Sequence, residues 1–176
     1  MDWRYHLMLW HPRLFRPTTD EPYRTLGYPN CERGWQGVLV LLCRRIEMAL
    51  GDREEFEFIR IKQKFGTLRL YWEAEASEET NAKIDNAVDL AVARSACTCE
   101  VCSREGRLHN NEGWLETRCA EHAVGTPVLP RYGTGFETVH RLRRRLGQAE
   151  VYYARYDRQA DSLTEVEPPP SARRKV

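Results

Sequence analysis

The sequence lacks any long hydrophobic run and any large excess of charge of one sign. Its longest apolar run, Val38 to Cys43, is far shorter than the roughly 20 residues that cross a bilayer, and residues 1–4 lack the apolar stretch of a signal peptide. The formal net charge of 176 residues is only +1, which does not indicate a globally basic nucleic-acid binder. We therefore expect a cytoplasmic protein without membrane association, in which any charged binding surface is local.

Motifs of common catalytic sites are also missing. The chain has no Gly-rich phosphate loop, and His6, His11 and His140 lie far apart in the sequence without a clear Ser or Cys partner. These absences argue against an enzyme. The content of 41% hydrophobic and 30% charged residues is nevertheless sufficient for a folded core.

Two closely spaced pairs of potential metal ligands stand in the middle of the chain. Two residues separate Cys99 from Cys102, two separate Cys119 from His122, and sixteen residues lie between the pairs. Such pairs joined by such a gap are typical of structural zinc sites. Three thiolates and one imidazole complete a tetrahedral shell around Zn²⁺ with no open position, which indicates a structural ion rather than a catalytic one.

Three further residues could compete for the metal. Cys97 precedes Cys99 by two positions, which gives a poorer chelating pair than the two-residue gap. His109 could replace His122, but it has no neighbouring ligand, and Cys31 is remote in sequence. The sequence leaves open whether Cys97 or His109 contributes to the site.

A β-hairpin and two helices are predicted to form the core of an α+β domain. Segments 56–61 and 67–72 have the β-branched and aromatic residues of strands, and Gly66 lies in the link between them, where it can adopt a positive φ. Apolar residues recur at helical spacing over 34–50. Ser77, followed by two glutamates, predicts the start of a second helix.

The second half of the chain is expected to contain a zinc module and an extension. In a treble-clef-like module, a strand over 114–117 would turn into a short helix that carries the second ligand pair. Apolar residues at helical spacing predict a C-terminal helix over 136–146. The expected divisions are an α+β core over 1–123 that includes the zinc module at 97–123, an extension over 124–157, and a disordered tail over 158–176.

Short motifs of this chain resemble those of an uncharacterised family of phage and bacterial proteins. The run from Ile61 to Tyr71, IKQKFGTLRLY, is similar to the family's IKxKFGxLRFY, and segments 98–103 and 113–123 are similar to TCExCG and GWxxTxCxxHA. The chain departs from these motifs at Thr67 and Ser103, where the family commonly has Gly. The resemblance covers residues 9–123. It implies the zinc pairing and a single-domain span, and it suggests an accessory role such as inhibition of a host protein or regulation of transcription.

Two groups of basic residues are candidate binding surfaces. The first, on the predicted hairpin, comprises Arg60, Lys62, Lys64, Arg69 and Tyr71. The second, on the predicted C-terminal helix, comprises Arg141, Arg143, Arg144 and Arg145. Arginine beside an aromatic ring suits phosphate contact and base stacking, although an ordinary solvated face has the same composition.

The leading hypothesis is a non-enzymatic zinc-binding protein that acts through a protein partner, as a phage-type inhibitor or adaptor would. Abundant Trp and Tyr, near-neutral charge and a closed metal site favour it. The alternative is a regulatory nucleic-acid-binding zinc-finger protein. A treble-clef nuclease is a third candidate, but the sequence offers no suitably placed general-base His. Trp35 and Trp114 are expected in the core. The partner, the oligomeric state and the role of 124–176 do not follow from the sequence.

Overall fold

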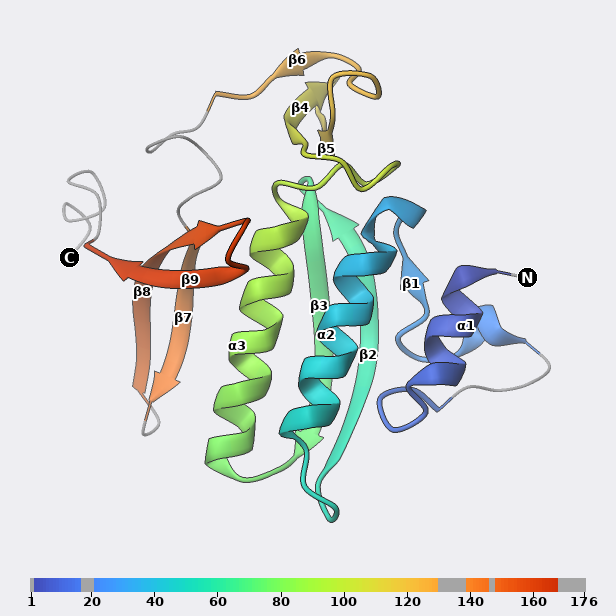
Figure 1. The fold of residues 1–176 in the computed structure, drawn as a ribbon, viewed down its shortest axis with the longest axis vertical. Coiled ribbons are helices and arrows are strands. Elements are labelled where there is room, and N and C mark those ends of the chain that lie inside the picture. The colour runs from blue at the N-terminus through green and yellow to red at the C-terminus, as the bar shows by residue number, and fades with distance from the viewer. Residues whose placement is uncertain (1, 17–20, 130–138, 146–147, 168–176) are drawn as a thin grey trace.

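The computed structural model of the chain describes residues 2–16, 21–129, 139–145 and 148–167. It is a mixed α+β fold with three small sheets, each of three strands (Figure 1). The helices are α1 (Trp3–Trp10), α2 (Gln36–Ala49) and α3 (Glu78–Ser95), with single 3₁₀ turns η1 (Pro22–Arg24) and η2 (Arg33–Trp35). The strands are β1 (Pro29–Asn30), β2 (Glu55–Lys64), β3 (Thr67–Glu75), β4 (Arg107–Asn111), β5 (Trp114–Arg118), β6 (Thr126–Pro127), β7 (Val139–Arg145), β8 (Gln148–Asp157) and β9 (Ser162–Val166).

The central sheet has the order β1-β2-β3, and α2 and α3 cover one of its faces (Figure 1). The predicted hairpin is confirmed: β2 and β3 pair antiparallel from Glu55 opposite Glu75 to Lys64 opposite Thr67. Its loop is only Phe65 and Gly66, with φ of 55° and 78°. Two positive φ values in a two-residue loop match the twist of the strands, so the strands extend further than the sequence predicts.

A β-bulge in β2 decides which side chains of the hairpin face the helices. The register shifts between Phe58, which pairs with Trp72, and Arg60, which pairs with Tyr71. One extra residue reverses the alternation of the strand. Phe58 and Ile61, three positions apart, are therefore both fully buried, and Arg60 points away from the core.

The core lies between the central sheet and the helices. Phe58 contacts Phe15 with a ring-centroid distance of 5.1 Å and meets Phe56 edge-on at 4.8 Å. The predicted helix that follows Ser77 is confirmed as α3, and the Ser77 side chain accepts a hydrogen bond from the backbone N–H of Thr80 at its first turn. The largest fully buried side chains of the described residues are Trp35, Phe15, Phe58, Leu7, Met8, Leu14, Leu39, Leu42, Ile46, Ile61, Leu68 and Ile84.

The sheet of β7, β8 and β9 packs beside α3 (Figure 1). Its contact is a small apolar cluster in which Tyr156 meets Leu90, Ala93 and Cys97 of the α3 region. An ion-pair network lies next to it: the Asp161 carboxylate accepts hydrogen bonds from Arg45 at 2.5 Å and Arg94 at 3.0 Å, and from the Tyr156 hydroxyl. Three elements distant in sequence therefore meet at one aspartate.

The C-terminal predictions were wrong in two places. The predicted helix over 136–146 is a strand where the structure describes it, β7, which pairs with β8. So short a stretch cannot separate helical from strand periodicity, and a neighbouring strand satisfied its backbone groups. The predicted disordered tail over 158–176 begins instead with a turn and β9, while residues 168–176 lie outside the described residues.

Candidate metal centre

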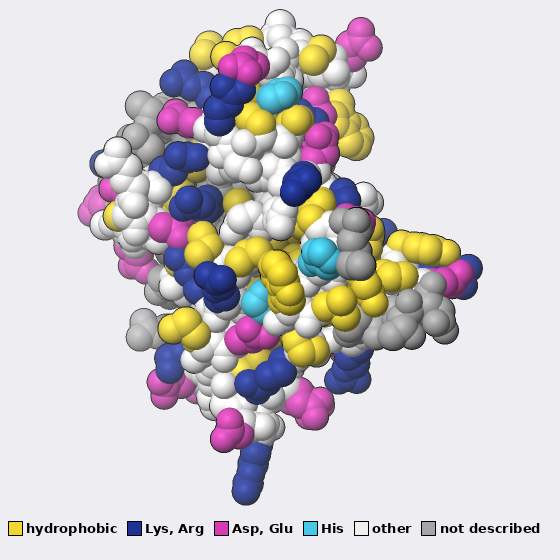
Figure 2. All heavy atoms as spheres, turned by 45° about the vertical axis from the view of Figure 1, so that its right-hand side comes forward, with side chains coloured by type: hydrophobic (Ala, Val, Ile, Leu, Met, Phe, Trp, Pro, Cys, Tyr) yellow, Lys and Arg dark blue, Asp and Glu magenta, His cyan; other side chains and the backbone are white. Residues whose placement is uncertain are grey.

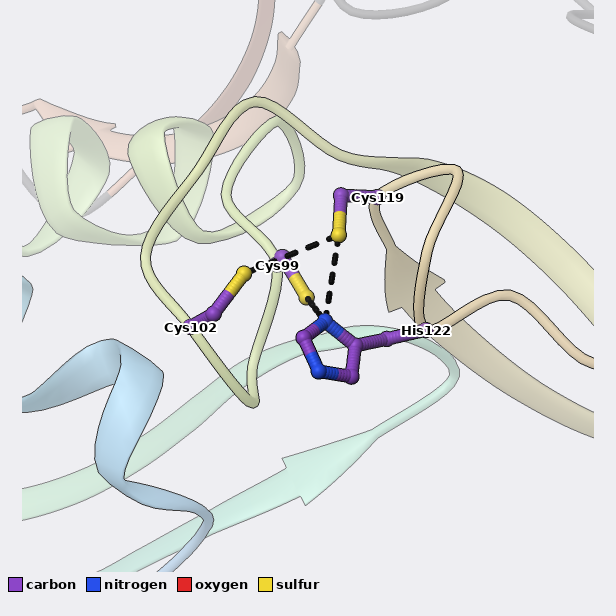
Figure 3. A group of neighbouring side chains, drawn as sticks. All are labelled: Cys99, Cys102, Cys119 and His122. Carbon is purple, nitrogen blue, oxygen red and sulfur yellow. Dashed lines mark hydrogen bonds between the residues drawn. The ribbon is translucent and has the colours of Figure 1, made fainter.

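The first ligand pair lies on a tight turn that directly follows α3. The N–H of Cys99 donates to the carbonyl of Arg104 at 2.7 Å, and the N–H of Ser103 donates to the carbonyl of Cys99 at 3.0 Å. Ser103 adopts a φ of 66°. The chain thus reverses within five residues, which turns the Cys99 and Cys102 thiols toward the same point (Figure 3).

The second pair follows β5 on a turn closed by a hydrogen bond from the N–H of His122 to the carbonyl of Cys119 at 3.1 Å. The predicted short helix is absent here, because residues 119–122 form a turn. The module is a β4–β5 hairpin with β6 on its other edge. The treble-clef prediction required a helix that carries the second ligand pair. In the described residues, the segment after Cys119 forms a turn and not that helix.

The four predicted ligands come together in space. Their potential ligand atoms all lie within 4.8 Å of one another. The Cys102 and Cys119 sulfurs are 3.6 Å apart, and His122 Nδ1 lies 3.2 Å from the Cys119 sulfur and 3.8 Å from that of Cys99 (Figure 3). Zn–S bonds of about 2.3 Å and Zn–N bonds of about 2.0 Å at tetrahedral angles require edges of about 3.5–3.8 Å. The cluster therefore has the dimensions to hold a metal ion.

The surroundings favour the metal-binding form of two of the thiols. Hydrogen bonds from Arg104 lower the pKa of Cys102 to about 6. Burial opposes ionisation of Cys119, but its hydrogen bonds to His122 prevail and its pKa is lowered. Burial raises the pKa of Cys99, which is fully buried. A cation at the centre of the cluster would supply the charge that ionises this third thiol.

The turn that carries Cys99 is held directly against the core. The Trp35 indole donates to the carbonyl of Thr98 at 2.8 Å, and the N–H of Gly34 donates to the carbonyl of Glu100 at 2.6 Å. A Cβ on Gly34 would lie 2.3 Å from the carbonyl oxygens of both Cys99 and Glu100. Gly34 and Trp35 therefore hold the turn that carries Cys99 against the core. We call these two residues the seat of the metal centre, and the sequence did not reveal this role.

A second contact missed by the sequence analysis is centred on Arg118 at the end of β5. Its guanidinium is 9% exposed and lies 2.8 Å from Glu32, 2.6 Å from Glu116 and 4.0 Å from Glu100. Glu100 also accepts a hydrogen bond from the backbone N–H of Glu32 at 3.1 Å. Burial raises the pKa of Glu100. These contacts join the ligand-bearing module to the segment before α2, and nothing in the local sequence of residue 118 points to them.

The competing residues lie apart from the cluster. Cys97 is buried, with its thiol near the carbonyls of Ala93 and Arg94. His109 lies on β4, where Nδ1 is 2.8 Å from the carbonyl oxygen of Arg107. Burial raises the pKa of Cys31 to about 12. In the part of the chain that the structure describes, only Cys99, Cys102, Cys119 and His122 form a group of potential metal ligands.

The structure keeps the predicted arrangement of one binding surface and changes that of the other. The residues of the first share one face of the hairpin, because Arg60 pairs with Tyr71 and Lys62 with Arg69, and Lys64 follows on the same side. The residues of the second, Arg141, Arg143, Arg144 and Arg145, lie on strand β7. Their predicted helical face therefore does not exist.

The two tryptophans also differ. Trp35 is fully buried as predicted, whereas Trp114 was wrongly placed in the core and is 63% exposed. Trp114 lies at the start of β5, beside the tight turn between β4 and β5. Among the described residues, no helix is long and apolar enough to cross a membrane.

Comparison with protein-family models, with curated proteins and with solved structures finds no match to this chain. The resemblance of its motifs to the phage and bacterial family therefore stays a prediction, and function has to be argued from the residues themselves.

Proposed function

We propose that this is a non-enzymatic zinc protein that acts by binding another protein through a surface near its N-terminus. The observation that carries this proposal is a set of large apolar side chains left exposed on α1 and the segment after it. We call the set the N-terminal apolar surface; it comprises Leu9, Trp10, Tyr23 and Leu26, which are 45%, 66%, 62% and 51% exposed. Figure 2 is turned so that the right-hand side of Figure 1, where α1 lies, comes forward, and it shows hydrophobic side chains gathered in a band across this face.

The N-terminal apolar surface is not a by-product of poor packing. Helix α1 buries Trp3, Leu7 and Met8 against the core, so its exposed residues are in excess of what the fold requires. Trp10 stacks on His6 at a centroid distance of 5.9 Å, which limits its freedom before any partner binds. Tryptophan and tyrosine are among the residues most enriched at energetically important points of protein interfaces.

The metal in this proposal is Zn²⁺, and its role is structural. Three cysteines and one histidine form a soft, four-membered ligand set that suits zinc and leaves no position for substrate. The site lies at the base of the hairpin of β4 and β5, because Cys119 directly follows β5. A role in stability, rather than in chemistry, accounts for this closed arrangement.

The proposal is tested by capture of partners with the full-length, tagged protein from cells that produce it, with and without nuclease treatment. We compare the wild type with Trp10→Ser/Tyr23→Ser and with the control Met48→Ser. Met48 is 87% exposed and lies on α2, so its loss changes exposed apolar area elsewhere. We expect a discrete, nuclease-resistant protein partner that the double variant loses and the control keeps.

Equal capture by all three proteins would overturn the proposal. Sedimentation velocity on the same samples distinguishes a foreign partner from a second copy of the chain. Circular dichroism and zinc content establish that the variants are folded, which is expected because both substituted side chains are exposed.

A further inference from the structure

The outward face of the β2–β3 hairpin carries four cations and an exposed tyrosine. We call it the hairpin face; it comprises Arg60, Lys62, Lys64, Arg69 and Tyr71. The bulge after Phe58 creates it, because uninterrupted alternation would have turned Arg60 and Lys62 toward the helices. Arg60, Lys64 and Arg69 are exposed, and Tyr71 is 46% exposed.

The charge of the hairpin face is not neutralised by the protein. Within the described residues, none of its four cations takes part in an ion pair; Lys64 lies over the Phe65 ring at 5.1 Å. Glu32, Glu100 and Glu116, which are gathered around Arg118, line one cavity with Lys62, whereas Arg60, Lys64 and Arg69 do not line it. A chain of net charge +1 thus gathers four cations without an ion pair on one small surface of the described residues.

The hairpin face continues onto the zinc module. Lys62 and Gln63 line a cavity of about 330 Å³ together with Trp114 and Arg118. The Gln63 side chain donates a hydrogen bond to the carbonyl of Leu115 at 2.6 Å, which fixes β5 beside the end of β2. Lys62 therefore lies near two exposed aromatic residues: Tyr71, two positions from its strand partner Arg69, and Trp114, which lines the same cavity.

We propose that the hairpin face and Trp114 bind single-stranded nucleic acid. Unpaired Lys and Arg suit a phosphate backbone, and exposed rings on either side of them suit bases that are not held in a duplex. Arginine and tyrosine are enriched at protein interfaces but lysine is depleted there, so Lys62 and Lys64 favour nucleic acid over a protein partner at this face. No residue is shared with the N-terminal apolar surface, so this proposal can fail or succeed independently of the first.

The test is fluorescence anisotropy of the zinc-loaded, full-length protein with labelled dT₁₂ and U₁₂ oligonucleotides, a duplex of matched length, and labelled polyglutamate. We expect binding to the single strands that weakens steeply with salt, with a slope of log K against log salt of about −3 if four phosphates are neutralised. The duplex and polyglutamate should bind at least tenfold more weakly, because neither presents free bases.

Variants separate charge from stacking. Lys62→Gln/Arg69→Gln should weaken binding and reduce the slope by about 1.4, while the control Arg44→Gln/Arg53→Gln, which removes two exposed arginines outside the hairpin face, should leave the slope unchanged. Tyr71→Ala and Trp114→Ala should each weaken binding by about tenfold. Tyr71→Phe and Trp114→Phe keep the ring and should retain it.

Three results would each overturn the proposal: no binding at low salt, equal binding of single strands and polyglutamate, or equal affinity of the Gln variant of the hairpin face and its control. Thermal unfolding and zinc content show whether a variant that loses binding is still folded. When Tyr71→Ala and Tyr71→Phe have equal thermal stability, loss of binding in the first but not in the second is due to loss of the ring.

Discussion

The central α+β core and the ligand-bearing module of residues 97–123 are stabilised in opposite ways. The core buries large apolar side chains such as Trp35, Phe15 and Phe58 completely. In the two main strands of the module, β4 and β5, the buried residues are Thr117 and Arg118, both polar. Burial of apolar area drives the folding of the first region, whereas the second has almost none to bury. A small hairpin without an apolar core needs another source of stability, and a metal ion held by the Cys99, Cys102, Cys119 and His122 cluster would provide it.

The largest expected effect follows from removal of the metal. Binding of a structural zinc ion contributes on the order of 10 kcal/mol to the region that it folds. With a chelator, or in Cys99→Ser and Cys119→Ser, we expect residues 97–123 to lose hydrogen-exchange protection and the protein to lose solubility, while α2 keeps its protection. Hydrogen exchange followed by mass spectrometry gives the result for each segment, and elemental analysis gives the zinc content.

The matched control for this experiment is Cys97→Ala, since Cys97 is a buried cysteine outside the cluster. It should retain one equivalent of zinc. If α2 and α3 lost hydrogen-exchange protection at the same rate as residues 97–123, the core and the module would unfold as one unit. The two regions would then not be stabilised in different ways. A full equivalent of zinc in Cys119→Ser would show that the ligand set is wrong.

The next largest effect is expected at the seat of the metal centre. In Gly34→Ala, the new Cβ would meet two carbonyl oxygens of the ligand-bearing turn at 2.3 Å, so the turn must move away from the core. Overpacking of this kind costs about 3 kcal/mol. We expect a lower free energy of unfolding and weaker zinc affinity in competition with a chromogenic chelator.

Gly37→Ala is the matched control, because it is the same substitution three residues later. Nothing lies within 4 Å of the position of its Cβ, and alanine is favoured over glycine in a helix by about 1 kcal/mol. We therefore expect a more stable protein with unchanged zinc affinity. If Gly34→Ala were as stable as Gly37→Ala, the backbone contact between Gly34 and the ligand-bearing turn would have room for a methyl group, contrary to the structure.

The sequence predicted the core and the ligand cluster well because both follow from local rules. Helical periodicity over 34–50 corresponds to α2, preceded by η2, and Ser77 caps α3 as its side chain and the following acidic residues suggest. Ligand spacing was sufficient to select Cys99, Cys102, Cys119 and His122, since pairs two residues apart can point to one centre from a tight turn.

What the sequence could not provide depends on contacts between distant segments. The bulge at Ile59 leaves no local signal, yet it places Arg60 and Lys62 on the outer face. Trp114 has a large apolar side chain, and its 63% exposure depends on tertiary packing that the local sequence does not encode. The turn at 119–122 and the strand β7 were predicted as helices, because short segments take the structure that their neighbours permit.

The C-terminal sheet offers a third mode of stabilisation, and a smaller effect is expected there. Asp161 joins it to α2 and α3 through Arg45 and Arg94. Asp161→Asn should cost about 2 kcal/mol, the range for hydrogen bonds to charged groups, and should raise exchange in β8 and β9 without loss of zinc. Asp52→Asn, in the loop after α2 where the side chain is exposed, is the control. Unchanged protection of β9 would show that the apolar contact of Tyr156 suffices.

The smallest effect is expected at the N-terminus of α3, the end of the helix far from the metal. The Ser77 hydroxyl accepts a hydrogen bond from the N–H of Thr80 at 3.2 Å, and loss of such a cap costs about 1 kcal/mol. Ser77→Ala should therefore lower the free energy of unfolding of the core in urea, whereas Ser77→Gly should lower it by only a few tenths. Zinc affinity should be unchanged in both, because the cap and the ligand-bearing turn lie at opposite ends of α3. A fall in zinc affinity with Ser77→Ala would mean that α3 transmits the stability of the core to the metal centre, which would replace the contrast between the two regions with a single cooperative structure.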